Sequence, residues 1–173
     1  MSSAFKNMTT LRSIALLDTL RVTTMSNMFQ GCTNLITIPE FNTPQLTDTS
    51  YMFDGCTLLE NIPAIKTDKV TNMSYMFQNC KALKEIPLFN TNSVTNMSYM
   101  FNGCTSLTTA PIHAYNTSKV TNMQYMFNGC TTLKELSFVG CDLSKVTTWS
   151  NIVTGCSALT KVDFTNCKVG NGF

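Results

Sequence analysis

Apolar and polar positions alternate along this chain in units of 24 to 26 residues. Five copies carry a Met-Phe pair, a Cys three residues after the Phe and a Leu three residues after the Cys, and a less exact copy flanks them on each side. The Phe column comprises Phe5, Phe29, Phe53, Phe77, Phe101, Phe127 and finally Val153. A period of this size predicts a solenoid, because one unit cannot bury its own apolar side and must stack on its neighbours.

The segment before each Cys is predicted to form a short helix, as over residues 94–104. Met97, Met100 and Phe101 have the i, i+3, i+4 spacing of one buried helical face. A Thr column is expected to supply N-caps, and a Gly or Asn column to supply left-handed C-caps. The Thr column is Thr23, Thr47, Thr71, Thr95, Thr121 and Thr147. The Gly/Asn column is Asn7, Gly31, Gly55, Asn79, Gly103, Gly129 and Gly155.

The segment after each Cys is predicted to form a short parallel strand. The last two units read Leu133-x-x-Leu136-x-Phe138-x-x-Cys141-x-Leu143 and Leu159-x-x-Val162-x-Phe164-x-x-Cys167-x-Val169, which is the leucine-rich-repeat pattern. A Pro column, formed by Pro39, Pro63, Pro87 and Pro111, should stop the earlier strands, because Pro cannot donate to a sheet ladder.

The expected fold is α/β: a leucine-rich-repeat solenoid with short parallel strands on one face and short helices on the other, 24–26 residues per coil. We expect a single domain over residues 1–173 with about seven strand units. Neither end resembles a dedicated polar cap, so we expect that the natural chain is longer or that the ends associate with another copy.

Units that read V-T-N-M-S-Y-M-F-x-x-C-x-x-L closely resemble the BspA-like leucine-rich repeats of bacterial surface proteins. Residues 70–77 and 94–101 carry the motif nearly intact, and the resemblance covers residues 5 to about 169. Proteins of that family are often exported or lipid-anchored and are implicated in adhesion to host proteins and to other cells. The resemblance therefore implies a cell-surface or extracellular location and transfers no catalytic residue. Residues 1–4 do not have the character of a signal peptide, and no lipobox Cys is found.

Composition argues against several classes of function. Charged residues make up only 13% of the chain and the net charge is +2, with Lys and Arg scattered along the sequence. A nucleic-acid surface needs clustered cations, so no nucleic-acid partner is predicted. No apolar run approaches the roughly 20 residues that cross a bilayer, so no membrane insertion is predicted.

The cysteines allow three interpretations: disulfides between neighbouring coils, a metal site, or buried thiols that fill a small apolar slot. No C-x-x-C pair exists, which disfavours metal, and Met8 in the Cys column of the first unit favours buried thiols. His113, the single histidine, lacks an orienting carboxylate at a meaningful spacing, and we expect it on the surface of a longer loop. No cofactor, metal site or catalytic residue is predicted.

Two columns are candidates for ligand binding. The first is the set of strand positions between core residues: Thr37, Asn61, Glu85, Thr109, Glu135 and Lys161. The second is a column of aromatic residues: Tyr51, Tyr75, Tyr99 and Tyr125. The strand positions can equally be solvated residues without a ligand. The tyrosines can anchor a partner, but we favour the interpretation that they lean on one another from coil to coil.

The expected function is a non-enzymatic binding or adhesion module that presents a repeated, neutral surface to a protein or a glycan. One alternative is a structural component of a virion or surface layer that docks through its ends or through the Tyr column. An enzyme is the weaker alternative, because a pocket with converging polar groups is not evident in the sequence.

Overall fold

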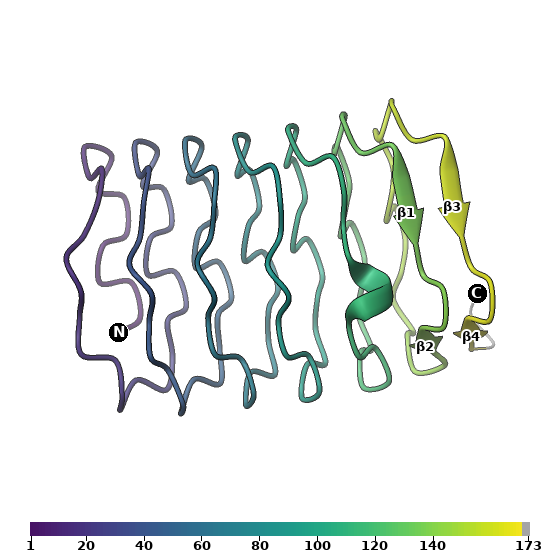
Figure 1. Ribbon diagram of the computed structural model, residues 1–173, viewed down its shortest axis with the longest axis horizontal. Coiled ribbons are helices and arrows are strands. Elements are labelled where there is room, and N and C mark those ends of the chain that lie inside the picture. Colours follow the sequence, from purple (N-terminus) through teal and green to yellow (C-terminus); the bar gives the residue numbers. More distant parts are fainter. Residues whose placement is uncertain (171–173) are drawn as a thin grey trace.

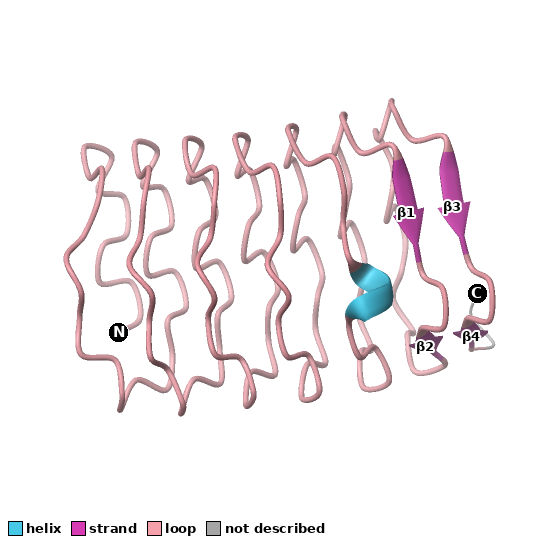
Figure 2. Cartoon of the chain, viewed as in Figure 1, coloured by secondary structure: helices cyan, strands magenta, loops and turns pink. Residues whose placement is uncertain are grey.

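The chain winds into coils that stack along one axis, from the first coil at one end to the last strands at the other (Figure 1). This computed structural model describes residues 1–170. Its regular elements are few and short, and most of each coil is turn and loop (Figure 2). They are the 3₁₀ helix η1 (Ile112–Ala114) and the strands β1 (Glu135–Ser137), β2 (Asp142–Leu143), β3 (Lys161–Asp163) and β4 (Lys168–Val169).

Within the described residues, parallel strands form only in the last two units. β1 pairs with β3, and Glu135 lies opposite Lys161. β2 pairs with β4, and Asp142 lies opposite Lys168. The prediction of a strand in every unit is confirmed in these two units and wrong in the five earlier ones. Four of those five carry the Pro column, and each Pro lacks the amide that a ladder requires. We call this side of the solenoid, with the equivalent segments 36–41, 60–65, 84–89 and 108–115, the strand face.

The prediction of short helices is wrong. Residues 97–104 and their equivalents, which we call the turn face, form consecutive hydrogen-bonded turns instead. The amides of Met100, Asn102 and Cys104 donate to the carbonyl three residues earlier at 3.1 to 3.3 Å. Tyr99 has φ 55° and Gly103 has φ 72°, so a left-handed residue recurs every fourth position. An α-helix needs φ near −63° throughout and cannot pass through these residues.

Alternate amides of the turn face donate to the next coil. The amides of Met97, Tyr99 and Phe101 reach carbonyls of the following coil at 2.9 Å, and that of Gly103 does so at 2.7 Å. The acceptors are, in order, Asn122, Gln124, Met126 and Asn128. The pattern repeats through the stack, so nearly every turn-face amide is used either within its coil or by its neighbour.

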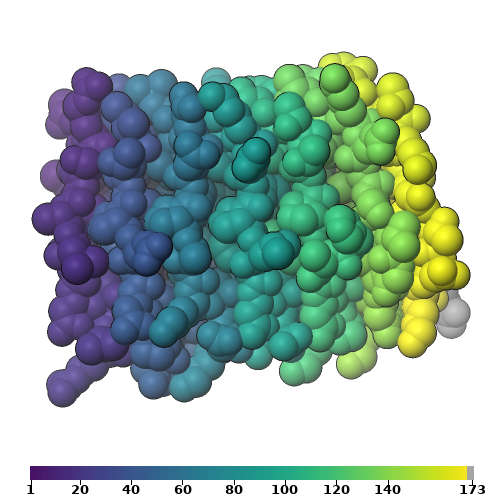
Figure 3. Space-filling model, in the orientation of Figure 1, coloured from purple at the N-terminus to yellow at the C-terminus, as the bar shows by residue number. Residues whose placement is uncertain are grey.

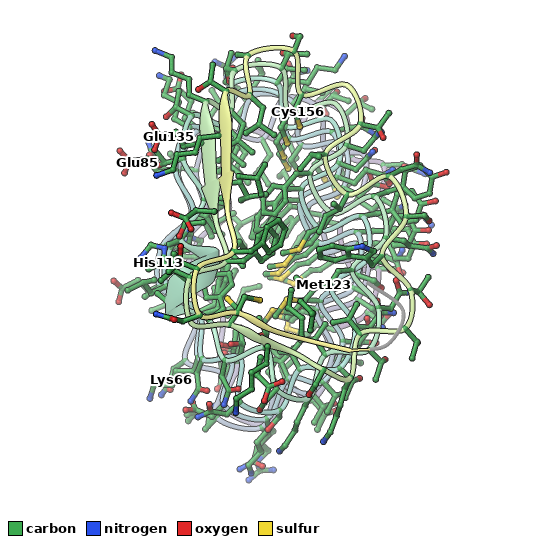
Figure 4. All side chains as sticks on the ribbon, turned by 90° about the vertical axis from the view of Figure 1, so that its right-hand side faces the viewer. Lys66, Glu85, His113, Met123, Glu135 and Cys156 are labelled. Atoms are coloured by element: carbon green, nitrogen blue, oxygen red, sulfur yellow. The ribbon has the colours of Figure 1, made fainter. Side chains whose placement is uncertain are left out.

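The interior is filled by the columns that the repeat predicts. The five Phe side chains from Phe29 to Phe127 are fully buried, as are Met97 and Met100. The rings of neighbouring Phe residues stack almost parallel, with centroids 5.4 to 5.6 Å apart. A view along the axis shows rings and sulfur atoms packed between the two faces (Figure 4). The inward direction of the i, i+3, i+4 positions is therefore confirmed, although the element that carries them is not a helix.

The Gly/Asn column is left-handed throughout, as predicted. Its φ angles run from 56° at Asn79 to 77° at Gly155. Each Asn of the column is followed one coil later by a Gly. A Cβ at Gly103 would lie 2.7 Å from Asn79 Oδ1, whereas one at Gly129 would lie 3.7 Å from the nearest atom, in Gly103. An Asn side chain therefore leans over the coil that follows it and requires a Gly there.

The N-cap role predicted for the Thr column is wrong. The amide and the hydroxyl of Thr95 both donate to the carbonyl of Thr71 in the preceding coil, at 2.9 and 3.2 Å. The capping contact is made one residue later, where Asn96 Oδ1 accepts from the amide of Ser98 at 3.0 Å. The Thr column therefore forms a ladder of hydrogen bonds between coils, and the following residue, which is Asp or Asn in four of the six copies, starts the turns.

Replacing Phe101 with Ala should lower the free energy of unfolding by about 3 to 5 kcal/mol, because it opens a cavity inside a continuous ring stack. Tyr99→Ala should cost less, since that ring is partly exposed and loses only its stacking on two neighbours. Urea denaturation of both variants gives the comparison. Equal losses would contradict the assigned directions of these two side chains.

Gly129→Asn should be tolerated with a cost below about 1 kcal/mol, because Asn enters the left-handed region readily and the preceding coil has Gly103 there. Gly103→Asn should cost about 2 kcal/mol more, because its Cβ meets the Asn79 side chain. Thermal and urea unfolding of this matched pair test the rule. Similar losses for the two variants would show that coil-to-coil contact at this column does not constrain it.

Candidate functional site

The six strand-face candidates form one row of exposed side chains. Thr37, Asn61, Glu85, Thr109, Glu135 and Lys161 are all exposed, with one residue in each coil. Glu85 and Glu135 project from the same side of the solenoid as His113 (Figure 4). Figure 3 views this face along its whole length. The row contains neutral, acidic and basic side chains. The nearby ion pair between Lys84 and Glu60, at 2.8 Å, is also exposed.

Hollows between coils accompany this row, and no residue pattern in the chain indicates them directly. One hollow of about 430 Å³ includes Thr37 and Asn61 in its lining. Another of about 320 Å³ includes Glu85, Thr109 and His113. Both lie in units that carry the Pro column, where no strand closes the space between coils. The Pro column is the signal that could have indicated them. His113 is exposed in η1, as expected.

The Tyr column lies on the turn face, so it cannot share one site with the strand-face row. Neighbouring rings stack with centroids 4.3, 4.5 and 4.7 Å apart and planes within 14° of parallel. Both faces of Tyr75 and Tyr99 are therefore covered by other rings, and only their edges and hydroxyls reach the surface. Loss of water around these phenols, and their proximity to one another, raises the pKa of Tyr75 and Tyr99. A ligand-binding role for this column stays a prediction.

A ladder of amide side chains runs beside the Tyr column and was not anticipated. Gln30 Nε2 donates to Asp54 Oδ2 at 2.9 Å, and Asn102 Nδ2 donates to Asn128 Oδ1 at 2.9 Å. Partial burial raises the pKa of Asp54, although the hydrogen bond from Gln30 opposes this shift. The ladder ties neighbouring coils together and leaves few free donors for a ligand on this face.

All eight cysteines are free thiols, and all except Cys167 donate from Sγ to a backbone carbonyl of the preceding coil. Cys80 Sγ donates to the Phe53 carbonyl at 3.1 Å, and Cys104 Sγ to the Phe77 carbonyl at 3.0 Å. Burial raises the pKa of Cys130 to about 12 and that of Cys141 to about 11. Inert buried thiols fit these contacts better than disulfides do. Met8 is exposed, so its place in the column gives no support to this conclusion.

A metal-binding constellation is not found among residues 1–170. No group of three or more His, Cys, Asp or Glu side chains in that range could hold a metal ion. No helix there is long and apolar enough to cross a bilayer. No buried side-chain nitrogen or oxygen atom of the described residues lacks a hydrogen-bond partner.

These features define the class: a leucine-rich-repeat solenoid whose surface is a lattice of short polar side chains. A family profile described as "Mycoplasma protein of unknown function, DUF285" matches residues 1–87 and 50–167. The chain belongs to this family. No curated protein matches it in sequence.

Two solved structures share the fold. A leucine-rich cell surface protein from Faecalibacterium prausnitzii A2-165 is 28% identical with a TM-score of 0.58, over 81% of this chain and 36% of that one. A leucine-rich-repeat protein of T. pallidum is 19% identical with a TM-score of 0.62, over 91% of this chain and 72% of that one. The chain thus spans about a third of the Faecalibacterium protein's length. The resemblance to BspA-like leucine-rich repeats is confirmed.

The buried thiols make stability depend on pH. Their folded pKa lies above the unfolded value of about 8.5, so the folded chain keeps protons that the unfolded chain loses. The stabilisation is complete below the unfolded pKa and is lost as the pH rises toward the folded value, about 12 for Cys130. Each buried thiol should lower the free energy of unfolding by about 1.4 kcal/mol per pH unit above about pH 9.

Urea denaturation of the wild type and Cys130→Ala, from about pH 7 to about pH 11, measures this contribution. The variant should lose stability less steeply above about pH 9, by the slope of one thiol. Below about pH 8 the two curves should run parallel, which serves as the internal control. Parallel curves over the whole range would contradict a protonated Cys130 in the folded state.

Proposed function

We propose that this chain is a non-enzymatic recognition module that binds a protein or a glycan through the strand face. The observation that carries the proposal is the row of six exposed side chains, one per coil, on a rigid stack. Such a row gives many weak contacts in fixed register, so the binding energy adds along the axis without an ordering cost for each contact.

The contrast between the two faces supports the strand face as the binding surface. On the turn face, the backbone amides, the Tyr rings and the amide side chains are already used between coils. On the strand face, most of the six side chains have no role in holding the coils together, and hollows lie between them. Small polar groups around shallow hollows suit sugar hydroxyls or a flat protein surface better than a phosphate-rich ligand.

Location at the cell surface is part of the proposal. The Faecalibacterium relative is described as a cell surface protein, and a surface module would meet host proteins and glycans there. The alternative, an assembly component that docks through the ends of the stack or through the Tyr column, predicts self-association in place of ligand binding.

A matched pair of variants tests the strand face. Thr37→Arg combined with Thr109→Arg places bulky cations in the row. Thr33→Arg adds one such cation at an exposed position outside the row, four residues from Thr37, and is compared with Thr37→Arg alone as well as with the double variant. Binding to a glycan array and to purified serum and matrix proteins should be saturable for at least one ligand. The row variant should weaken it by at least about tenfold, and Thr33→Arg should leave it unchanged.

Sedimentation of the chain alone distinguishes a recognition module from an assembly component. A monomer with saturable, row-dependent binding supports recognition. Concentration-dependent self-association without any saturable ligand would reject the proposal in favour of assembly. Binding that Thr33→Arg weakens as much as the row variant would place the site elsewhere.

A further inference from the structure

An open groove crosses the first three coils on the strand face, beside the row described above. Its volume is about 580 Å³, within the range of small ligand sites. The lining comes from three equivalent segments, residues 16–20, 40–42 and 64–66. None of the six row residues belongs to it, so its occupancy does not depend on the proposed function of the row.

The groove has an apolar rim that solvent reaches. Leu16 is 74% exposed and Leu20 is 51% exposed, and both line the groove. The inward residues Phe41 and Ile65 form its floor. A single exposed Leu is ordinary, but two at the edge of one hollow form a patch that gains free energy when an apolar group covers it.

Charges of opposite sign lie at the two ends of the groove. Asp18, Asn42 and Lys66 occupy one column in successive coils. The column is fixed by the adjacent threonines: Thr19 Oγ1 donates to the Asn42 carbonyl at 2.9 Å, and Thr43 Oγ1 donates to the Lys66 carbonyl at 3.2 Å. Two coil spacings separate Asp18 from Lys66 by about 10 Å along the axis.

Neither charge is neutralised within the described residues. The Asp18 carboxylate accepts one hydrogen bond, from the amide of Leu20 at 3.1 Å, and forms no ion pair. The Lys66 ammonium has no hydrogen bond or ion pair there. Glu40, also unpaired, adds a second carboxylate to the lining. Along the axis, the groove therefore carries the two exposed leucines and Asp18 at its first coil, Glu40 at its second and the Lys66 ammonium at its third.

We propose that this groove binds an extended segment of a partner protein that carries an apolar and a cationic side chain at one end and a carboxylate at the other end along the solenoid axis. The charge pattern sets this chemistry. A polyproline II segment fits the spacing, because residues i and i+3 project to the same side about 9 Å apart. The cation meets Asp18 and Glu40, the apolar side chain lies against Leu16 and Leu20, and the carboxylate meets Lys66.

Titration of the ¹⁵N-labelled full chain with the peptide Ac-Leu-Lys-Pro-Pro-Glu-NH₂, whose Lys and Glu are three residues apart, tests the proposal by NMR. Chemical-shift changes should concentrate in residues 16–20, 40–42 and 64–66. Two control peptides, Ac-Ser-Lys-Pro-Pro-Glu-NH₂ and Ac-Leu-Glu-Pro-Pro-Glu-NH₂, remove the apolar group and the cation respectively. Each should bind at least about threefold more weakly, the scale expected for one exposed charge or one partly covered Leu.

Variants of the chain give the second arm. Leu16→Ser with Leu20→Ser should weaken binding by about tenfold, and Leu58→Ser, at an exposed Leu outside the groove, should not. Lys66→Glu should reverse the preference, so that Ac-Leu-Lys-Pro-Pro-Lys-NH₂ binds more tightly than Ac-Leu-Lys-Pro-Pro-Glu-NH₂. This reversal is a gain of binding, which an unfolded variant could not show.

Three results would overturn the proposal. The first is the absence of shifts in the groove at millimolar peptide. The second is peptide binding that Thr109→Arg abolishes, which would assign it to the row. The third is binding to anionic phospholipid vesicles that the Leu16 and Leu20 substitutions remove while the peptide response is unchanged, which would make the groove a lipid contact.

Discussion

The structure depends on one constraint: every second amide of the turn face must reach a carbonyl of the next coil. The amides of Tyr99, Phe101 and Gly103 do so at 2.7 to 2.9 Å, and the same pattern repeats along the stack. The remaining turn-face amides close turns within their own coil. Because the hydrogen-bond spacing between coils is fixed, it also sets the distance between stacked Phe rings and between stacked Tyr rings. The packing of the core and the order of the surface are consequences of the same ladder.

This ladder explains which residue types each column accepts. A chain that alternates turn bonds with ladder bonds must enter the left-handed region at two positions per coil. Gly and Asn meet that need at little cost at one position. At the other, Tyr75 and Tyr99 adopt φ of 55 to 59°, which is unfavourable for an aromatic residue. Stacking on a ring above and a ring below offsets that cost, and Asn27 and Asn151 occupy the same column where the Tyr stack ends.

The repeat period, the inward direction of the Phe and Met columns and the left-handed Gly/Asn column could all be predicted from the sequence, because side-chain size and backbone freedom determine them directly. The sequence pattern could not distinguish an α-helix from a series of four-residue turns. Met97, Met100 and Phe101 share a face in an α-helix, and successive four-residue turns also bring these positions inward. What distinguishes the two is the conformation of Tyr99, which has no reliable signature in a single sequence. The charged groove could not be predicted from the sequence for another reason. Asp18 and Lys66 are seen to share one column only once the coil register is known.

The strand face is where this architecture can differ from one coil to the next. On the turn face a substitution is felt in the neighbouring coils, as the contact between Asn79 and the Gly103 position illustrates. On the strand face, Pro interrupts the ladder in four coils, so few contacts between coils restrict the side chains there. The same region contains the hollows, the inserted turn η1 and the groove with charges of both signs. A protein with so uniform an interior can encode a specific partner only where its coils are free to differ, and in this chain that freedom lies on the strand face.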